Sequence, residues 1–153
     1  MIGDERTLLC FRVAKMNEKK ILVIDDDEKF RGMLQRILEK EGYAVLVAAD
    51  GREGVECFSH HPVDLVITDL IMPDMEGIET IIQLRAAQPE AKIIAISGGG
   101  RRGPEDYLPI AKTLGAQQTF AKPFDLKEFL TAVANLLADP QECIPEDQGF
   151  QTA

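Results

Sequence analysis

Short apolar runs alternate with stretches of helical period along residues 20–138, and this alternation is the feature that most constrains the fold. Strands are predicted at Ile21–Asp25, Ala44–Ala48, Leu65–Thr68, Ile93–Ser97 and Thr119–Ala121. Consecutive apolar residues indicate strands that are buried on both faces, as in parallel sheets. Because parallel strands need crossover helices between them, the sequence predicts a doubly wound α/β domain with five parallel strands and five helices.

Apolar residues between the runs recur at the spacing of amphipathic helices. The first helix is expected to end at Gly42, because glycine suits a left-handed C-terminal cap. The second helix is expected over about residues 52–60. The apolar positions that define the remaining pattern are Phe30, Met33, Leu34, Ile37 and Leu38 in the first helix, Ile78, Ile81, Ile82 and Leu84 in the third, Tyr107, Ile110 and Leu114 in the fourth, and Phe129, Val133, Leu136 and Leu137 in the fifth.

The regular pattern is confined to residues 19–138, which are expected to form one domain. Residues 1–18 show no clean period, and we expect a flexible N-terminal extension there. Residues 139–153 contain two prolines and four acidic residues but no basic one, so we expect a disordered acidic tail. Since no output domain follows this tail, the chain is expected to act as a stand-alone domain.

The bulk composition limits the classes of partner. A formal net charge of -9 argues against binding to nucleic acid, because phosphate recognition needs a basic face. No apolar stretch approaches the length of roughly 20 residues that spans a bilayer. The N-terminus also lacks the charged segment followed by an apolar segment that is typical of a signal peptide. We therefore expect a cytoplasmic protein without membrane contact. Cys10, Cys57 and Cys143 are widely separated, which indicates neither a disulfide framework nor a thiolate metal site.

Polar residues that suit phosphoryl transfer follow the predicted strands. They are Asp25, Asp26 and Asp27 after the first strand, Asp69 after the third, Ser97 at the end of the fourth and Lys122 after the fifth. In a sheet of order 2-1-3-4-5 these strand ends are neighbours. Carboxylates that are forced together repel one another, and Mg²⁺ relieves this repulsion through oxygen ligands. Asp69 would then be the nucleophile that accepts a phosphoryl group as an acyl phosphate.

Each of these residues also has a plainer interpretation. Asp27 and Glu28 are better explained as a helix N-terminal cap and first turn. Ser97 alone would more often be a turn residue, and Lys122 alone a solvated charge. His60 and His61 suit a helix C-terminus better than a metal site. Only the coincidence of the polar residues at neighbouring strand ends favours the chemical interpretation.

Four segments resemble the receiver domain of two-component response regulators: Ile21–Asp27, Asp64–Gly77, Ile93–Ser97 and Ala121–Phe124. The resemblance covers about residues 19–138 and implies a flavodoxin-like fold. It also implies that the peptide bond between Lys122 and Pro123 is cis, which the tertiary amide of proline makes accessible.

The same resemblance implies a role for each site residue. Asp25 and Asp26 match the acidic pair that binds Mg²⁺, and Asp69 matches the phosphorylated aspartate. Ile71 matches the residue whose backbone carbonyl completes the metal shell. Ser97 matches the hydroxyl that contacts the phosphoryl group, and Lys122 the lysine that pairs with it.

The sequence departs from the family pattern near the expected switch. Thr119 stands where the family usually has an aromatic residue, and Phe120 should point to the opposite face of the sheet. We therefore expect the loop that begins with Gly98, Gly99 and Gly100 to replace the aromatic residue as the switch, closing over the phosphoryl group. Ile71 and Gly99 stand where some members of the family place polar groups that orient an attacking water. Neither side chain can do so, and slow hydrolysis of the phosphorylated state is expected.

Together these features predict a stand-alone receiver that takes a phosphoryl group on Asp69 from a sensor histidine kinase or a histidine phosphotransfer protein. Its only chemistry would be self-catalysed phosphotransfer and autodephosphorylation. Output would come from docking of an unknown downstream protein on the face of the fourth helix, fifth strand and fifth helix, or from a phosphorelay. One alternative is a binding module of the same fold that works without phosphorylation. A small aspartyl-nucleophile phosphatase is the other, although Glu28 and Lys29 do not fit its pattern.

Overall fold

A computed structural model describes residues 18–71, 77–98 and 104–138 of the chain. Strands and helices alternate in the order β1 (Lys20–Ile24), α2 (Glu28–Lys40), β2 (Ala44–Ala48), α3 (Gly51–His60), β3 (Leu65–Asp69), α4 (Gly77–Ala87), β4 (Ile93–Ser97), α5 (Pro104–Thr113), β5 (Gln118–Ala121) and α6 (Leu126–Leu137). All neighbouring strands pair in parallel, in the order β2-β1-β3-β4-β5. The predicted fold class and strand order are therefore confirmed.

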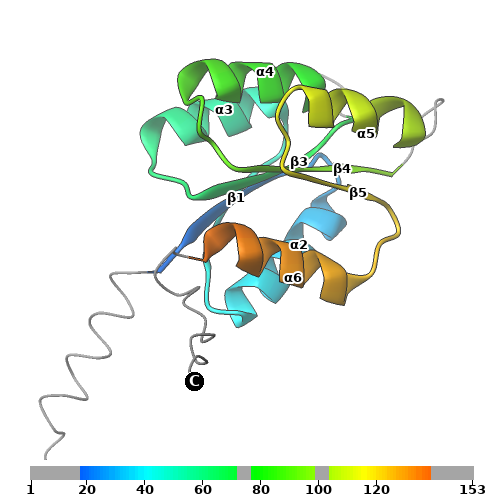
Figure 1. Cartoon of the computed structure of the whole chain (residues 1–153). Coiled ribbons are helices and arrows are strands. Elements are labelled where there is room, and N and C mark those ends of the chain that lie inside the picture. Colours follow the sequence, from blue (N-terminus) through cyan, green and yellow to red (C-terminus); the bar gives the residue numbers. More distant parts are fainter. Residues whose placement is uncertain (1–17, 72–76, 99–103, 139–153) are drawn as a thin grey trace, which may run out of the picture.

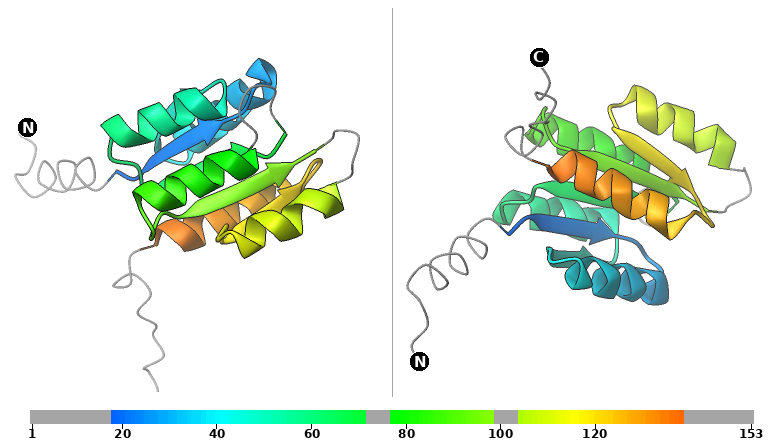
Figure 2. Two further views of the ribbon diagram at one scale, coloured as in Figure 1. Left: turned by 90° about the horizontal axis from the view of Figure 1, so that it is seen from above. Right: turned by 60° about the horizontal axis from the view of Figure 1, so that its bottom comes forward.

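Helices cover both faces of this sheet. In Figure 1, α3, α4 and α5 lie above the sheet, whereas α2 and α6 lie below it, and the two views in Figure 2 agree. Alternate residues of one strand belong to different cores: Leu22 and Ile24 pack under α3 and α4, whereas Ile21 and Val23 pack against α2 and α6. This double burial explains why the strands appear in the sequence as continuous apolar runs.

Aspartates cap three of the helices. Asp27 accepts hydrogen bonds from the backbone N–H groups of Lys29 and Phe30, which confirms the cap interpretation of this residue. Asp50 and Asp125 cap α3 and α6 in the same way. After α2, Gly42 has a φ of 98°, the left-handed conformation expected of it.

The first strand ends one residue earlier than predicted. β1 ends at Ile24, and the carboxylate of Asp25 accepts a hydrogen bond from the backbone N–H of Asp27, two residues further on, at 2.8 Å. This local bond ends the extended conformation, because it closes a turn between the strand and α2. Asp25 therefore lies at the rim of the sheet and not within it.

Some predictions concern residues outside the described ranges. The extension before residue 18, the tail after residue 138, Cys10 and Cys143 all lie there, while Cys57 is a half-buried free thiol. Among the helices of the described ranges, none has the length and apolar character that crossing a membrane requires.

Gly77 occupies a position at the start of α4 that excludes any side chain. A Cβ atom there would approach the backbone oxygen of Asp69 to 2.2 Å and the Cα atom of Leu70 to 2.4 Å. Replacing Gly77 with Ala is therefore expected to destabilise the fold by about 2 kcal/mol or more, because backbone must move to admit the methyl group. Urea unfolding of the two proteins measures this loss.

Gly32 provides the matched control for that substitution. It lies inside α2, and a Cβ atom there would meet no atom within 4 Å. Gly32→Ala should therefore stabilise the protein by about 0.5 to 1 kcal/mol, through the better helix propensity of alanine. Equal effects of the two substitutions would show that the contact at Gly77 does not limit the side chain.

Candidate functional site

The sheet brings the polar residues together at the carboxyl ends of its parallel strands. Asp25 follows β1, Asp69 is the last residue of β3, and Ser97 is the last residue of β4. Lys122 lies directly after β5, and its N–H donates to the carbonyl of Ser97 at 2.8 Å. The peptide bond that follows Lys122 is cis, as the family resemblance implied. Residues that are distant in sequence thus share one small site, as the strand order required.

Three carboxylates form the acidic part of the site. One oxygen from each of Asp25, Asp26 and Asp69 lies within 4.8 Å of the others. The side chains of Asp25 and Asp69 are almost fully buried, whereas Asp26 is exposed. A cluster of hard oxygen donors that is open to water on one side matches the ligands that Mg²⁺ prefers. The donor set therefore fits this ion.

Lys122 partly neutralises the carboxylates. Its Nζ atom lies 3.2 Å from Oδ2 of Asp25 and 3.2 Å from Oδ2 of Asp69. Burial by itself would lower the pKa of Lys122, but the charges of Asp69 and Asp25 outweigh it and raise the pKa above its ordinary value. The ammonium is therefore charged at neutral pH and held between two acidic side chains.

Within the cluster, the carboxyl group of Asp25 has a raised pKa. Burial is the main cause that raises the pKa of its carboxyl group to about 6, and the charge of Asp69 adds to this effect. The hydrogen bond from Asp27 and the ammonium of Lys122 act in the opposite direction. Negative charge is therefore unfavourable at Asp25, and a bound cation would relieve it.

Ser97 contributes a buried hydroxyl group at the end of β4. The residue is fully buried, and within the described part of the chain its Oγ atom has no hydrogen-bond partner. A buried hydroxyl without a partner costs free energy, so such groups usually have a functional reason. Here the hydroxyl is available to a ligand at the same strand ends as Asp69.

The other predicted residues are placed as follows. The backbone N–H of Ile71 donates to Oδ1 of Asp69 at 3.0 Å, which orients the carboxylate, and the metal-ligand role of its carbonyl stays a prediction. Thr119 is half-buried on β5, while Phe120 packs against Phe124 and Phe129 on the side of α2 and α6. Gly98 follows β4, whereas Gly99 and Gly100 lie outside the described residues, so the loop switch remains a prediction.

Two residues of the site were not expected from the sequence. Nη1 of Arg31 donates to the carbonyl of Asp25 at 2.7 Å and thereby braces the turn after β1. The Phe30 ring lies under Lys122, with its centroid 3.9 Å from Nζ. Helical spacing assigned Phe30 only to the apolar face of α2, and Arg31 had no sequence signal, because both contacts depend on how α2 meets the strand ends.

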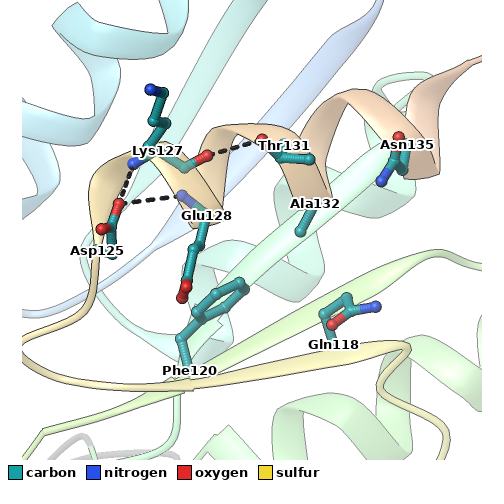
Figure 3. Close-up of a pocket in the computed structure, with 8 residues that line it drawn as sticks. All are labelled: Gln118, Phe120, Asp125, Lys127, Glu128, Thr131, Ala132 and Asn135. Carbon is teal, nitrogen blue, oxygen red and sulfur yellow. Dashed lines mark hydrogen bonds between the residues drawn. The ribbon is translucent and has the colours of Figure 1, made fainter.

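The described part of the chain has one hollow next to Lys122 and another between β5 and α6. The first, of about 570 Å³, is lined by Lys122 and Gly98 together with apolar residues of α2, of the segment after β5 and of the start of α6. A second hollow, of about 660 Å³, is shown in Figure 3 between β5 and α6. It is lined by Gln118, Phe120, Asp125, Lys127, Glu128, Thr131, Ala132 and Asn135. The second hollow contains no residue of the acidic cluster and is therefore separate from it.

A sheet of this order with an acidic pocket, a lysine and a hydroxyl at its strand ends is consistent with phosphoryl acceptance on an aspartate. Residues 21–134 match the response regulator receiver domain, so the chain belongs to that family. Receiver domains are signalling modules that histidine kinases phosphorylate, and they bind Mg²⁺ at an acidic pocket.

Individual relatives support this assignment. Sporulation initiation phosphotransferase F of Bacillus subtilis is 35% identical over 122 residues, which cover 80% of this chain and 95% of that protein. The alkaline phosphatase synthesis transcriptional regulatory protein PhoP of Bacillus subtilis is 32% identical over 130 residues, covering 85% of this chain. Only 53% of that regulator is covered, so the chain spans about half of its length.

Solved structures agree with the fold. A receiver domain protein from Clostridium thermocellum has a TM-score of 0.73 and 28% identity, covering 82% of this chain and 99% of that chain. The response regulator TrrA from Thermotoga maritima, solved in complex with Mg²⁺ and BeF, has a TM-score of 0.68 and 31% identity. The match covers 77% of this chain and 98% of the TrrA chain.

Proposed function

We propose that Asp69 accepts a phosphoryl group from a phosphohistidine of a sensor histidine kinase or histidine phosphotransfer protein. One observation carries this proposal. The ammonium of Lys122 lies 3.2 Å from the carboxylates of both Asp69 and Asp25. The hydroxyl of Ser97, at the end of β4, has no hydrogen-bond partner among the described residues. A nucleophile, a cation and a hydrogen-bond donor are thus assembled where a phosphoryl group carries its charge.

In the transfer step, a carboxylate oxygen of Asp69 attacks the phosphorus atom, and the bond from phosphorus to the histidine nitrogen breaks. The products are an acyl phosphate on Asp69 and a free imidazole, which takes up a proton from water. Lys122 neutralises a phosphoryl oxygen, and the Ser97 hydroxyl donates a hydrogen bond to another. Asp25, Asp26 and Asp69 would hold Mg²⁺, which supplies further neutralisation of the phosphoryl oxygens.

The signal would then leave through the receiver surface itself, by docking or by a phosphorelay. The match with the Bacillus subtilis phosphotransferase covers 95% of that protein, which supports the proposal of a stand-alone receiver. The face of α5, β5 and α6 is the proposed docking surface for a downstream protein, and it carries the hollow of Figure 3. This hollow combines the apolar ring of Phe120 with polar side chains of α6, as interaction surfaces commonly do.

Phosphoramidate, a small donor with a phosphorus–nitrogen bond, tests the proposed function. Incubation with phosphoramidate and Mg²⁺ should add one phosphoryl group, as measured by intact mass, and hydroxylamine should remove it because an acyl phosphate is cleaved by this nucleophile. EDTA should suppress the gain. Absence of any gain would favour the phosphorylation-independent binding module, whereas repeated turnover of p-nitrophenyl phosphate would favour a phosphatase.

The phosphorylated state is expected to hydrolyse slowly. The side chain of Ile71 is apolar and half-buried next to Asp69, so it cannot orient an attacking water. After removal of the donor, the decay of the phosphorylated mass should extend over many minutes. Ile71→Asn should shorten this decay if the side chain at this position limits hydrolysis. A wild-type half-life of seconds would contradict the expectation.

A further inference from the structure

We infer that Phe30 is a positioning residue for phosphoryl transfer, because its ring holds the Lys122 ammonium against the acidic cluster. The inference deepens the proposed function and rests on it. Phe30 is on α2 and Lys122 follows β5, so the contact joins two segments that are far apart in sequence.

The ammonium of Lys122 has different neighbours on its two sides. Carboxylate oxygens of Asp25 and Asp69 lie at 3.2 Å, and the centroid of the Phe30 ring lies at 3.9 Å. A cation this close to an aromatic face is attracted by the ring quadrupole, more strongly where water is largely excluded. The Lys122 side chain is 22% exposed, so the contact is mostly shielded from solvent.

The stem of Lys122 is confined as well. A Cβ atom on Gly98 would lie 2.4 Å from Cδ and 2.6 Å from Cβ of Lys122, so the backbone at Gly98 already packs against the lysine stem. Lys122 and Gly98 line the same hollow as Phe30. The side chain of Lys122 therefore lies between the backbone of Gly98 and the ring of Phe30, and its ammonium contacts the carboxylates of Asp25 and Asp69.

The Phe30 ring is itself held in place. Its centroid is 6.1 Å from that of Phe124, with an interplanar angle of 89°, the edge-to-face arrangement that aromatic pairs prefer. Phe124 in turn packs against Phe129 of α6 at 5.0 Å. At the start of α2, the Asp27 cap accepts the N–H of Phe30. Because its surroundings fix the ring, it can restrict the motion of the ammonium.

This restriction matters during transfer, when Lys122 must exchange partners. The ammonium now neutralises Asp25 and Asp69, and it must turn to a phosphoryl oxygen when Asp69 is modified. The ring attracts the cation without forming a hydrogen bond, so it can remain in contact while the oxygen partners change. Loss of the ring should therefore affect the lysine more than the metal site.

Phe30→Leu tests the inference, because leucine keeps an apolar side chain but removes the ring. We expect the initial rate of phosphorylation by phosphoramidate and the affinity for beryllofluoride in Mg²⁺ to fall by about 2- to 10-fold, the factor that such a contact is worth. The affinity for Mg²⁺ alone should stay close to wild type. In NMR spectra, the Hε protons of Lys122 should lose the ring-current shift of the wild type. Phe30→Tyr keeps the ring and should restore all of these properties.

Phe58→Leu is the matched control. Phe58 on α3 is half-buried like Phe30, but it packs in the core on the opposite face of the sheet. The substitution makes the same change of side chain without touching the ring under Lys122, so it should keep the wild-type rate. Phe30→Met gives a second ringless variant if Phe30→Leu unfolds.

The outcomes are distinguishable. Wild-type rate and beryllofluoride affinity in a folded Phe30→Leu protein would overturn the positioning role while leaving phosphorylation of Asp69 intact. An equal loss in Phe58→Leu, or failure of Phe30→Tyr to recover, would also overturn it, since a general loss of packing would then be the cause. If the wild-type protein takes up no phosphoryl group, the proposed function fails, and the positioning role falls with it.

Discussion

Asp69→Asn is expected to abolish the gain of one phosphoryl group that the wild-type protein shows with acetyl phosphate and Mg²⁺. The amide that replaces the carboxylate is neutral and too weak a nucleophile to attack phosphorus. The side chain keeps its size, and one buried negative charge disappears from the cluster, so the protein should remain folded. Intact-mass analysis of the two proteins after equal incubation measures the effect.

Asp50→Asn is the control for this substitution. Asp50 caps α3 and does not belong to the cluster of Asp25, Asp26 and Asp69, and asparagine caps a helix about as well as aspartate. The control protein should therefore be phosphorylated like the wild type. A phosphoryl group that persists on Asp69→Asn would show that another residue is the acceptor, and peptide mapping would locate it.

Asp25→Asn is expected to weaken Mg²⁺ binding strongly and yet stabilise the metal-free protein. The pKa of Asp25 is raised from 3.8 to about 6, mainly by burial, so its ionised form is disfavoured in the folded state. A difference of about two pKa units corresponds to about 3 kcal/mol. The pKa of about 6 already includes the favourable ion pair with Lys122, so we expect a net gain of about 1 to 3 kcal/mol near neutral pH.

The sign of the pH dependence follows from proton linkage. The pKa in the folded state lies above the unfolded value, so protonation of Asp25 stabilises the fold. In the wild type this contribution is complete below the unfolded pKa of 3.8 and is lost as the pH rises through about 6. The advantage of Asp25→Asn should therefore be large near neutral pH and shrink as the pH falls through about 6. Urea unfolding in EDTA at several pH values measures it.

Asp26→Asn separates metal binding from stability. Asp26 belongs to the same carboxylate cluster but is exposed, so its charge remains hydrated in the folded protein. This variant should lose Mg²⁺ affinity without the gain in unfolding free energy. If both variants gain equal stability, repulsion within the cluster and not burial of Asp25 would be the main cost.

The sequence contained most of the fold and the chemical groups of the site. Continuous apolar runs separated by helical periods predicted the parallel sheet, because a strand covered on both faces has no polar side. Strand-end polar residues then marked the site, since parallel strands present their carboxyl ends at one edge. Asp25, Asp69, Ser97 and Lys122 meet there as predicted.

Helical spacing was a weaker guide to burial. Met33, Ile82 and Ile110 belong to the apolar patterns of their helices, yet they are 41%, 50% and 47% exposed. A periodic pattern identifies one side of a helix but does not say how much of that side the neighbouring elements cover. Coverage depends on how the helices pack on the sheet.

Tertiary structure alone decided the environment of each charge. Asp25 and Asp26 are adjacent in sequence, but the turn after β1 buries one carboxylate and leaves the other in water. Likewise, Phe30 is one of several apolar residues on α2, and only the packing of that helix on β2 and β1 puts its ring under Lys122, which follows β5. The sequence by itself determined which groups are available, because strand ends and helical periods are local. Distances, burial and pKa values depend on contacts between distant segments, and those are properties of the folded chain.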